Sequence, residues 1–148
     1  MATFLVVDDD PYMLETASVM LELAGHEVLR AGSGEAALKL CAEPNRAIHL
    51  VLTDIEMPLM NGPELAARLY SLIPHVAIVF MTAHCGQAPV QGMPVGGMPV
   101  PGKDVFGGHC IIRKPFTAAE LRKHMETVLP YAAARQSVQL DYLQPLIS

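Results

Sequence analysis

The sequence predicts an α/β fold with a five-stranded parallel sheet covered by helices on both faces. Short apolar runs alternate with stretches in which apolar residues recur at helical spacing, an order typical of right-handed β-α-β crossovers. The chain has 148 residues, 51% of them hydrophobic, which is enough for one buried core and too little for two ordinary domains. We expect one domain over residues 1–129, followed by a C-terminal extension or linker over residues 130–148.

The predicted strands are short runs rich in apolar and β-branched residues, as expected for strands that are buried on both faces. They comprise residues 4–7, 27–31, 48–53, 76–81 and 110–113. Helical spacing predicts helices that begin near Pro11, Ser33 and Pro63. A last helix is predicted to begin after Thr117, which is placed to form a capping box with Glu120.

The stretch 84–109 interrupts this alternation at the point where a fourth helix is due. Four prolines lie there among several glycines. Proline removes a backbone donor and clashes with the preceding turn, while glycine raises the entropy cost of ordering. A Gly-Met-Pro-Val sequence also occurs twice, at residues 92–95 and 97–100. We therefore expect the fourth helix to be replaced or disrupted by a long, mobile, partly extended loop rich in Gly, Pro and Met.

Composition argues against several classes of function. The formal net charge is −5, from 10 basic and 15 acidic residues, whereas sequence-independent nucleic-acid binding needs a basic face. The first residues lack the basic region of a signal peptide, and no apolar stretch is long enough to span a bilayer. Cys41, Cys85 and Cys110 are odd in number and form no CxxC pair, which fits reduced thiols. We expect a cytoplasmic protein without direct nucleic-acid or membrane contact.

Polar side chains follow four of the predicted strands, and they are Asp8 with Asp9, Asp54, Thr82 and Lys114. Because the carboxyl ends of parallel strands share one edge of a sheet, these side chains should converge. Three carboxylates at close range repel one another unless a cation balances them, and an all-oxygen ligand set favours Mg2+. Phosphoryl transfer needs mainly positioning and charge neutralisation, so Asp54 is a candidate nucleophile.

Around these residues the sequence resembles the receiver domains of two-component response regulators. The resemblance covers roughly residues 3–129 apart from the loop. Its motifs are Val-Val-Asp-Asp (6–9), Thr-Asp-Ile-Glu-Met-Pro (53–58) with Asn-Gly (61–62), Met-Thr-Ala (81–83) and Lys-Pro-Phe (114–116). Each motif alone is weakly specific, but the four occur together in the right order. The resemblance implies a doubly wound, flavodoxin-like sheet with the strand order 2-1-3-4-5.

The resemblance also implies a function. Asp54 would be the phosphoacceptor, receiving a phosphoryl group from a histidine kinase or phosphotransfer protein in a phosphorelay. Asp8, Asp9 and Asp54 would bind Mg2+ together with the backbone carbonyl of Glu56. The chain would not be an enzyme beyond self-phosphorylation from small phosphodonors and autodephosphorylation. Pairing into a homodimer is compatible with the resemblance.

Two further residues would contact the phosphoryl group, Thr82 by a hydrogen bond and Lys114 by charge, and the resemblance implies a cis bond between Lys114 and Pro115. The chain also departs from the family. Receivers usually carry an aromatic residue three positions before the lysine, where this chain has Ile111. Phe106, in the nearby loop, is a candidate substitute. Since the fourth helix is interrupted, we hypothesise that the loop is the moving element of the switch.

Two other functions remain open at this point. The Asp8-Asp9-Asp10 run contains the Asp-x-Asp spacing of haloacid-dehalogenase-like phosphatases, in which two carboxylates act as nucleophile and general acid. That reading leaves Asp54 and Lys114 unexplained. The chain could also be a degenerate receiver that acts only as a protein-interaction module.

Two segments have further interpretations. His84, Cys85, His109 and Cys110 flank the loop and are soft ligands for zinc or copper, although their spacing matches no compact metal motif. The apolar tail over 130–148 fits a short helix that covers the place of the missing helix or pairs with another subunit, and it equally fits a linker to an output domain.

Overall fold

The computed structural model describes residues 2–44, 47–83, 92–98, 100–103 and 105–147. Its sheet has the strand order β2-β1-β3-β4-β6-β5, in which the first five strands are parallel and β5 is antiparallel to β6. The strands are β1 (Thr3–Val7), β2 (Glu27–Ala31), β3 (Leu50–Asp54), β4 (Ala77–Thr82), β5 (Val105–Phe106) and β6 (His109–Arg113). The predicted order 2-1-3-4-5 is confirmed for the five parallel strands, whose bounds differ from the prediction by at most two residues.

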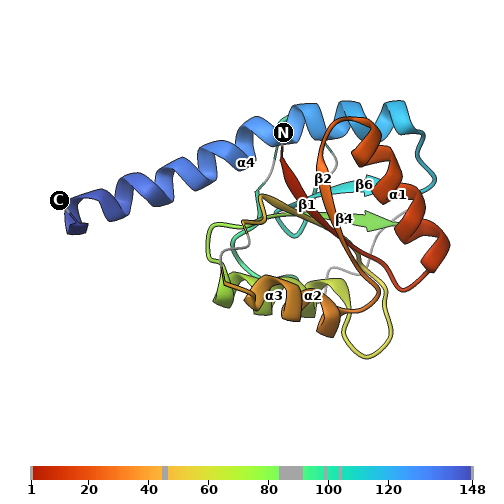
Figure 1. Cartoon of the computed structure of the whole chain (residues 1–148), viewed down its shortest axis with the longest axis horizontal. Coiled ribbons are helices and arrows are strands. Elements are labelled where there is room, and N and C mark those ends of the chain that lie inside the picture. Colours follow the sequence, from red (N-terminus) through yellow and green to blue (C-terminus); the bar gives the residue numbers. More distant parts are fainter. Residues whose placement is uncertain (1, 45–46, 84–91, 99, 104, 148) are drawn as a thin grey trace.

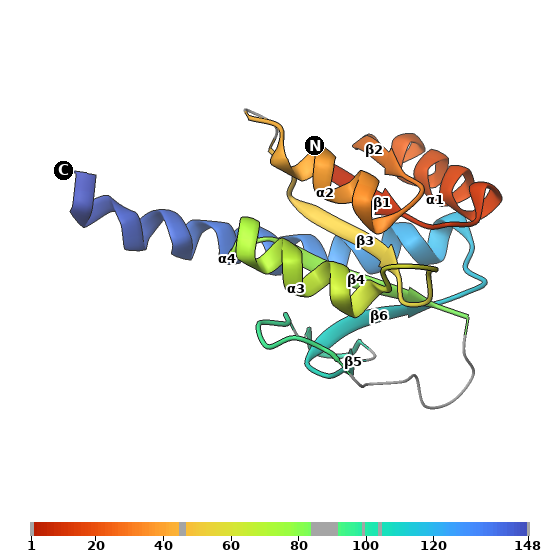
Figure 2. The same cartoon turned by 90° about the horizontal axis from the view of Figure 1, so that it is seen from below.

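In the part of the chain that the structure describes, four helices cover the sheet: α1 (Pro11–Leu23), α2 (Gly34–Ala42), α3 (Gly62–Leu72) and α4 (Ala118–Ile147). The helices α2 and α3 lie side by side on one face, and α1 and α4 lie on the other (Figures 1 and 2). The doubly wound α/β architecture predicted from the sequence is therefore confirmed.

Two apolar clusters fill the space between the sheet and its helices. Because successive side chains of a strand point to opposite faces, neighbouring residues such as Leu5 and Val6 belong to different clusters. The cluster beneath α1 and α4 includes Leu121 and Met125, and the cluster beneath α2 and α3 includes Leu65. Strands buried on both faces explain the unbroken apolar runs in the sequence.

Side-chain caps fix where the helices begin. The Asp10 carboxylate accepts a hydrogen bond from the Tyr12 N–H at 3.0 Å, and Ser33 and Asn61 cap α2 and α3 in the same way. The Thr117 hydroxyl accepts from the Glu120 N–H at 3.1 Å, which confirms the predicted cap of α4. These caps set the connections between the strand ends and the helices, where the functional site lies.

The segment beyond residue 129, expected as a C-terminal extension or linker that could be helical, belongs to α4, which continues through Pro130 to Ile147. Pro130 removes one backbone donor from the helix. Burial outweighs this cost, since Val128 and Ala132 on either side of the proline lie in the cluster beneath α4. The far part of α4 extends beyond the sheet (Figure 1).

The described part of the loop after β4 contains no helix, as expected from its prolines and glycines. It contains instead the short strand β5, which the sequence did not predict. Met93 packs against the cluster beneath α2 and α3, whereas Met98 and Val100 are buried in the cluster beneath α1 and α4. The two copies of the Gly-Met-Pro-Val repeat thus contribute to opposite faces of the sheet. Residues 84–91 lie outside the described residues.

We predict that Gly62→Ala destabilises the protein by about 1–3 kcal/mol, as overpacking does. An added Cβ at Gly62 would lie 2.5 Å from the Asp54 backbone oxygen and 2.9 Å from the Ile55 Cα. Gly32→Ala is the matched control, because a Cβ at Gly32 meets no atom within 4 Å. Urea unfolding of both variants measures the effect, and equal unfolding midpoints would contradict the prediction.

Candidate functional site

The site lies at the carboxyl edge of the sheet, where β1, β3, β4 and β6 end. Backbone hydrogen bonds extend the parallel ladder past the strand ends, from the Asp8 N–H to the Ala31 carbonyl at 3.2 Å and from the Lys114 N–H to the Thr82 carbonyl at 2.7 Å. Asp54 is the last residue of β3. The ladder therefore holds the backbones of these residues at one edge.

Three carboxylates meet there. One carboxylate oxygen from each of Asp8, Asp9 and Asp54 lies within 4.8 Å of the other two. Asp8 is buried, Asp9 is exposed and Asp54 is intermediate. Asp8 is held in place because its Oδ1 accepts a hydrogen bond from the Asp10 N–H at 3.0 Å. The predicted convergence of the three acids is present in the structure.

Lys114 supplies the positive charge that faces these acids. Its Nζ lies 2.8 Å from Asp8 Oδ2 and 3.4 Å from Asp54 Oδ2. The Lys114 side chain is 12% exposed, that of Asp8 is 0% exposed and that of Asp54 is 13% exposed, so water screens these charges only weakly. The direct ion pair between Lys114 and Asp8 was not predicted from the sequence, which assigned this lysine to the phosphoryl group.

The surroundings alter the protonation of two groups. Burial raises the pKa of Asp54, and the Asp8 charge raises it further, while the nearby Lys114 ammonium opposes the rise. Burial lowers the pKa of Lys114, but the hydrogen bond and charge of Asp8 and the charge of Asp54 outweigh burial and leave this pKa raised. Lys114 is therefore charged at neutral pH, and charging Asp54 costs free energy.

Thr82 and Glu56 were also predicted to contribute. Thr82 is buried and ends β4, one residue beyond Met81, which pairs with Asp54 in the sheet. The Glu56 N–H donates to Asp54 Oδ1 at 3.4 Å, which places the Glu56 backbone beside the acid. The roles of the Thr82 hydroxyl toward a phosphoryl group and of the Glu56 carbonyl toward a metal stay predictions.

The three acids also fit a metal ion. Among the described residues, Asp8, Asp9 and Asp54 are the one group of three or more potential ligands close enough to share an ion. All of their ligand atoms are oxygens, and at least one acid reaches solvent, so this donor set suits Mg2+ with water completing its shell. The residues therefore fit the cofactor expected from the sequence.

The transition-metal hypothesis gains no comparable support. Both ring nitrogens of His109 have hydrogen-bond partners, since Nδ1 lies 3.1 Å from the Gly107 carbonyl and Nε2 lies 2.9 Å from the Tyr70 hydroxyl. Cys110 is fully buried in the core. His84 and Cys85 lie outside the described residues.

The phosphatase alternative is also weakened by the structure. Its Asp-x-Asp spacing needs Asp10 to act on substrate beside Asp8. The Asp10 carboxylate instead accepts the Tyr12 N–H as the cap of α1, and Asp10 is not in the acidic group of the site. The third acid of that group is Asp54, which this alternative does not use.

Similarity to known proteins agrees with this geometry. A family model described as a response regulator receiver domain matches residues 4–100, which is more than half of the chain. The chain belongs to this family. The response regulator protein FleR of Pseudomonas aeruginosa is 39% identical over 83 residues, which cover 56% of this chain and 17% of FleR. FleR is thus much longer than the segment of it that aligns with this chain.

Solved receiver structures share the fold. A response regulator receiver domain protein from Clostridium thermocellum has a TM-score of 0.72 at 27% identity, covering 94% of this chain and 99% of that one. The response regulator TrrA from Thermotoga maritima, solved in complex with Mg2+-BeF, is 36% identical with a TM-score of 0.53. That alignment covers 57% of this receiver and 71% of TrrA.

This receiver keeps one expected feature of the family and lacks another. The peptide bond between Lys114 and Pro115 is cis, as the resemblance implied. Ile111, at the usual aromatic position, is buried in the cluster beneath α2 and α3. The Phe106 side chain, the candidate substitute, lies outside what the structure describes. Among the described residues, no helix of the receiver is both long and apolar enough to cross a bilayer.

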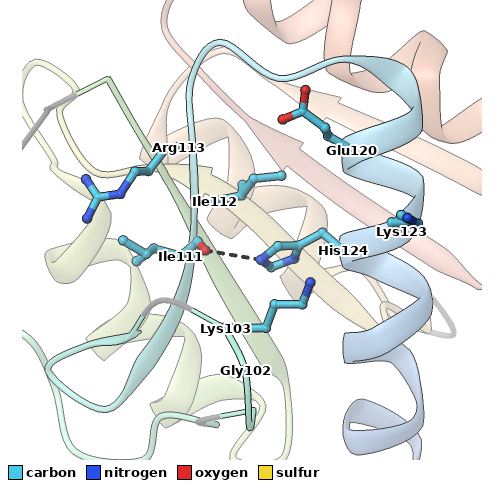
Figure 3. Close-up of a pocket in the computed structure, with 8 residues that line it drawn as sticks. All are labelled: Gly102, Lys103, Ile111, Ile112, Arg113, Glu120, Lys123 and His124. Atoms are coloured by element: carbon cyan, nitrogen blue, oxygen red, sulfur yellow. Dashed lines mark hydrogen bonds between the residues drawn. The ribbon is translucent and has the colours of Figure 1, made fainter.

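A separate cavity of about 380 Å³ lies between β6, the loop and α4 (Figure 3). It is formed by Lys103 of the loop, residues 111–113 of β6, and Lys123 and His124 of α4. The His124 Nε2 lies 3.1 Å from the Ile111 carbonyl, which joins α4 to β6. None of the site residues predicted from the sequence lines this cavity, whose existence depends on the course of the loop.

We predict that Asp54→Asn raises stability at neutral pH when no divalent cation is present. Because the folded-state pKa of Asp54 is raised, the folded protein keeps this proton after the unfolded chain has lost it. Asp54 therefore costs no stability below its unfolded pKa, and the cost develops as the pH rises through the folded pKa. Urea unfolding with a chelator measures the difference from the wild type, which should shrink as the pH falls from about 7 towards 4. A difference that is constant with pH would contradict the assignment.

Proposed function

We propose that this receiver is a phosphoacceptor switch that takes a phosphoryl group onto Asp54 from a partner histidine kinase or phosphotransfer protein. An oxygen of the Asp54 carboxylate attacks phosphorus, and the bond between phosphorus and the donor imidazole nitrogen breaks. The departing electron pair stays on the imidazole, which can then take up a proton. The product is an acyl phosphate on Asp54.

The observation that carries this proposal is the position of Lys114 between two acids. Its ammonium contacts Asp8 at 2.8 Å and Asp54 at 3.4 Å, so it already faces the carboxylate that would carry the phosphoryl group. A phosphoryl group on Asp54 adds about −1.5 to −2 charge at neutral pH. Lys114 can turn from the acids to the new oxygens without leaving the site.

Asp8, Asp9 and Asp54 would hold Mg2+, with the backbone carbonyl of Glu56 as a further ligand. Bound there, Mg2+ neutralises the charge of the acids and of the phosphoryl oxygens. Thr82 would donate its hydroxyl to a phosphoryl oxygen. Both tasks use the carboxyl edge of the sheet, where the described structure gathers these residues.

The added charge would shift the equilibrium between two conformations of the receiver. Partner proteins would bind one of the two conformations in preference to the other. We propose no turnover chemistry beyond self-phosphorylation from small phosphodonors and hydrolysis of the acyl phosphate. The proposal places the switch in the cytoplasm, with its kinase or phosphotransfer protein as the direct partner. Pairing of two receivers is compatible with it.

We predict that the receiver gains the mass of one phosphoryl group when it is incubated with acetyl phosphate or phosphoramidate and Mg2+. Intact-protein mass spectrometry measures the gain. Asp54→Asn should abolish it, because the amide cannot form the acyl phosphate. Asp10→Asn is the matched control in the same region, since Asn also caps a helix and Asp10 is not in the acidic group.

Labelling that persists in Asp54→Asn would contradict Asp54 as the acceptor. If neither a small phosphodonor nor a histidine kinase labels the wild type in the presence of Mg2+, the degenerate receiver that acts only through protein contacts becomes the better description. Asp10→Asn must still gain the phosphoryl group if the loss in Asp54→Asn is specific to Asp54.

We also predict that Mg2+ stabilises the folded receiver through the same acids. At a concentration of about 100 times Kd, a ligand specific for the folded state adds about 2.7 kcal/mol. Asp9→Asn should remove most of this gain, and because Asp9 is exposed, its substitution should leave the core intact. Urea unfolding with and without Mg2+ measures the gain, and Asp10→Asn serves as control. An equal gain in Asp9→Asn would exclude Asp9 as a ligand.

A further inference from the structure

We propose that Tyr70, His109 and Arg135 form a latch that fastens the loop segment 92–98 to helix α4, so that a rearrangement of the segment is transmitted to the C-terminal helix. The three residues come from α3, β6 and α4. The latch does not use Asp54, and the inference stands apart from the proposed phosphorylation.

Arg135 makes the contact between α4 and the segment. Its Nη2 donates a hydrogen bond to the Gly96 carbonyl at 2.5 Å, and its guanidinium carbon lies 5.5 Å from the centre of the Tyr70 ring. A hydrogen bond from a charged donor is stronger than one from a neutral donor, and a cation over an aromatic face is attracted to it. A single side chain of α4 thus holds the segment and also contacts α3.

Tyr70 is in turn fixed by His109, which is fully buried. The Gly107 carbonyl can only accept, so the His109 Nδ1 carries the proton and Nε2 accepts from the Tyr70 hydroxyl at 2.9 Å. Burial lowers the pKa of His109, which keeps this ring neutral and preserves Nε2 as an acceptor. The His109 ring also packs edge-on against Phe80 of β4. The latch is therefore anchored in the sheet.

The segment fits the latch closely. A Cβ added at Gly97 would lie 2.2 Å from the Gly108 carbonyl oxygen and 2.9 Å from the His109 Nδ1. Gly96 has a φ of +117°, which L side chains rarely adopt. Gly97 thus allows a close approach of the backbone that a side chain would prevent, and Gly96 allows a backbone conformation that a side chain would strain. The repeated Gly-Met-Pro-Val sequence has a structural role here as well as its role as a helix breaker.

The latch connects parts of the molecule that otherwise belong to different faces. Met93, at the start of the segment, packs against the cluster beneath α2 and α3, whereas α4 covers the opposite face. If the packing of Met93 against its cluster weakens, the contact between Arg135 and the segment can transmit the change to α4. Coupling of this kind is measured by a double-mutant cycle, because only the interaction between two substitutions isolates it.

The test is amide hydrogen exchange on the full chain, without phosphodonor or divalent cation. Arg135→Gln should raise exchange of residues 92–98 by about tenfold, since one charge-assisted hydrogen bond is lost. Arg122→Gln is the matched control on the same helix, because Arg122 is exposed and forms an ion pair with Glu126 at the surface. The inference is overturned if the two variants change exchange of the segment equally.

The second arm tests transmission. Met93→Ala should raise exchange of the segment and also of α4 beyond residue 128, and the effect on α4 should vanish when Arg135→Gln is present. An effect on α4 that is the same with and without Arg135 overturns the inference. Tyr70→Phe is a milder variant that removes only the hydroxyl, and it should raise exchange around residues 107–109. Unchanged exchange there also counts against the latch.

Discussion

Repulsion among three carboxylates, which one ammonium offsets only in part, is the constraint on which the carboxyl edge of this receiver depends. Asp8 is fully buried, and a buried acid is tolerated only if it is paired and hydrogen-bonded. Lys114 supplies the pair, and the Asp10 N–H supplies a hydrogen bond. The same lysine also contacts Asp54. The charge that stabilises the buried carboxylate of Asp8 therefore also pairs with the carboxylate of the proposed phosphoacceptor. One ammonium against three carboxylates leaves an excess of negative charge, which a divalent cation would offset before a phosphoryl group is added.

Much of the sheet could be predicted from the sequence because strands buried on both faces leave unbroken apolar runs. The acids were predictable for a related reason, since a polar residue directly after such a run must lie at the carboxyl edge. The resemblance to receivers then assigned their roles. What was missed lies in contacts between distant segments. The pairing of Lys114 with Asp8 depends on the exact approach of two strand ends, and no local pattern encodes it.

The course of the loop and of α4 was predicted only in part. Prolines and glycines correctly indicated that a regular fourth helix is absent from the described segment. They could not indicate that Met93 and Met98 would pack on opposite faces, because that depends on tertiary contacts. Pro130 lies inside α4, where burial of Ala132 outweighs the lost backbone donor. Local propensity was overridden by packing there.

His124 has a consequence for the free edge of the sheet. Outermost strands expose backbone groups that can pair with another chain and start aggregation. Here β5 pairs with His109 and Cys110, and among the described residues no strand lies beside the rest of β6 on that side. The His124 Nε2 lies 3.1 Å from the Ile111 carbonyl oxygen and forms a hydrogen bond with it. A foreign strand would therefore have to displace this side chain of α4 before it could pair with β6. A helix whose inner face closes the core thus also protects the receiver against edge-to-edge association.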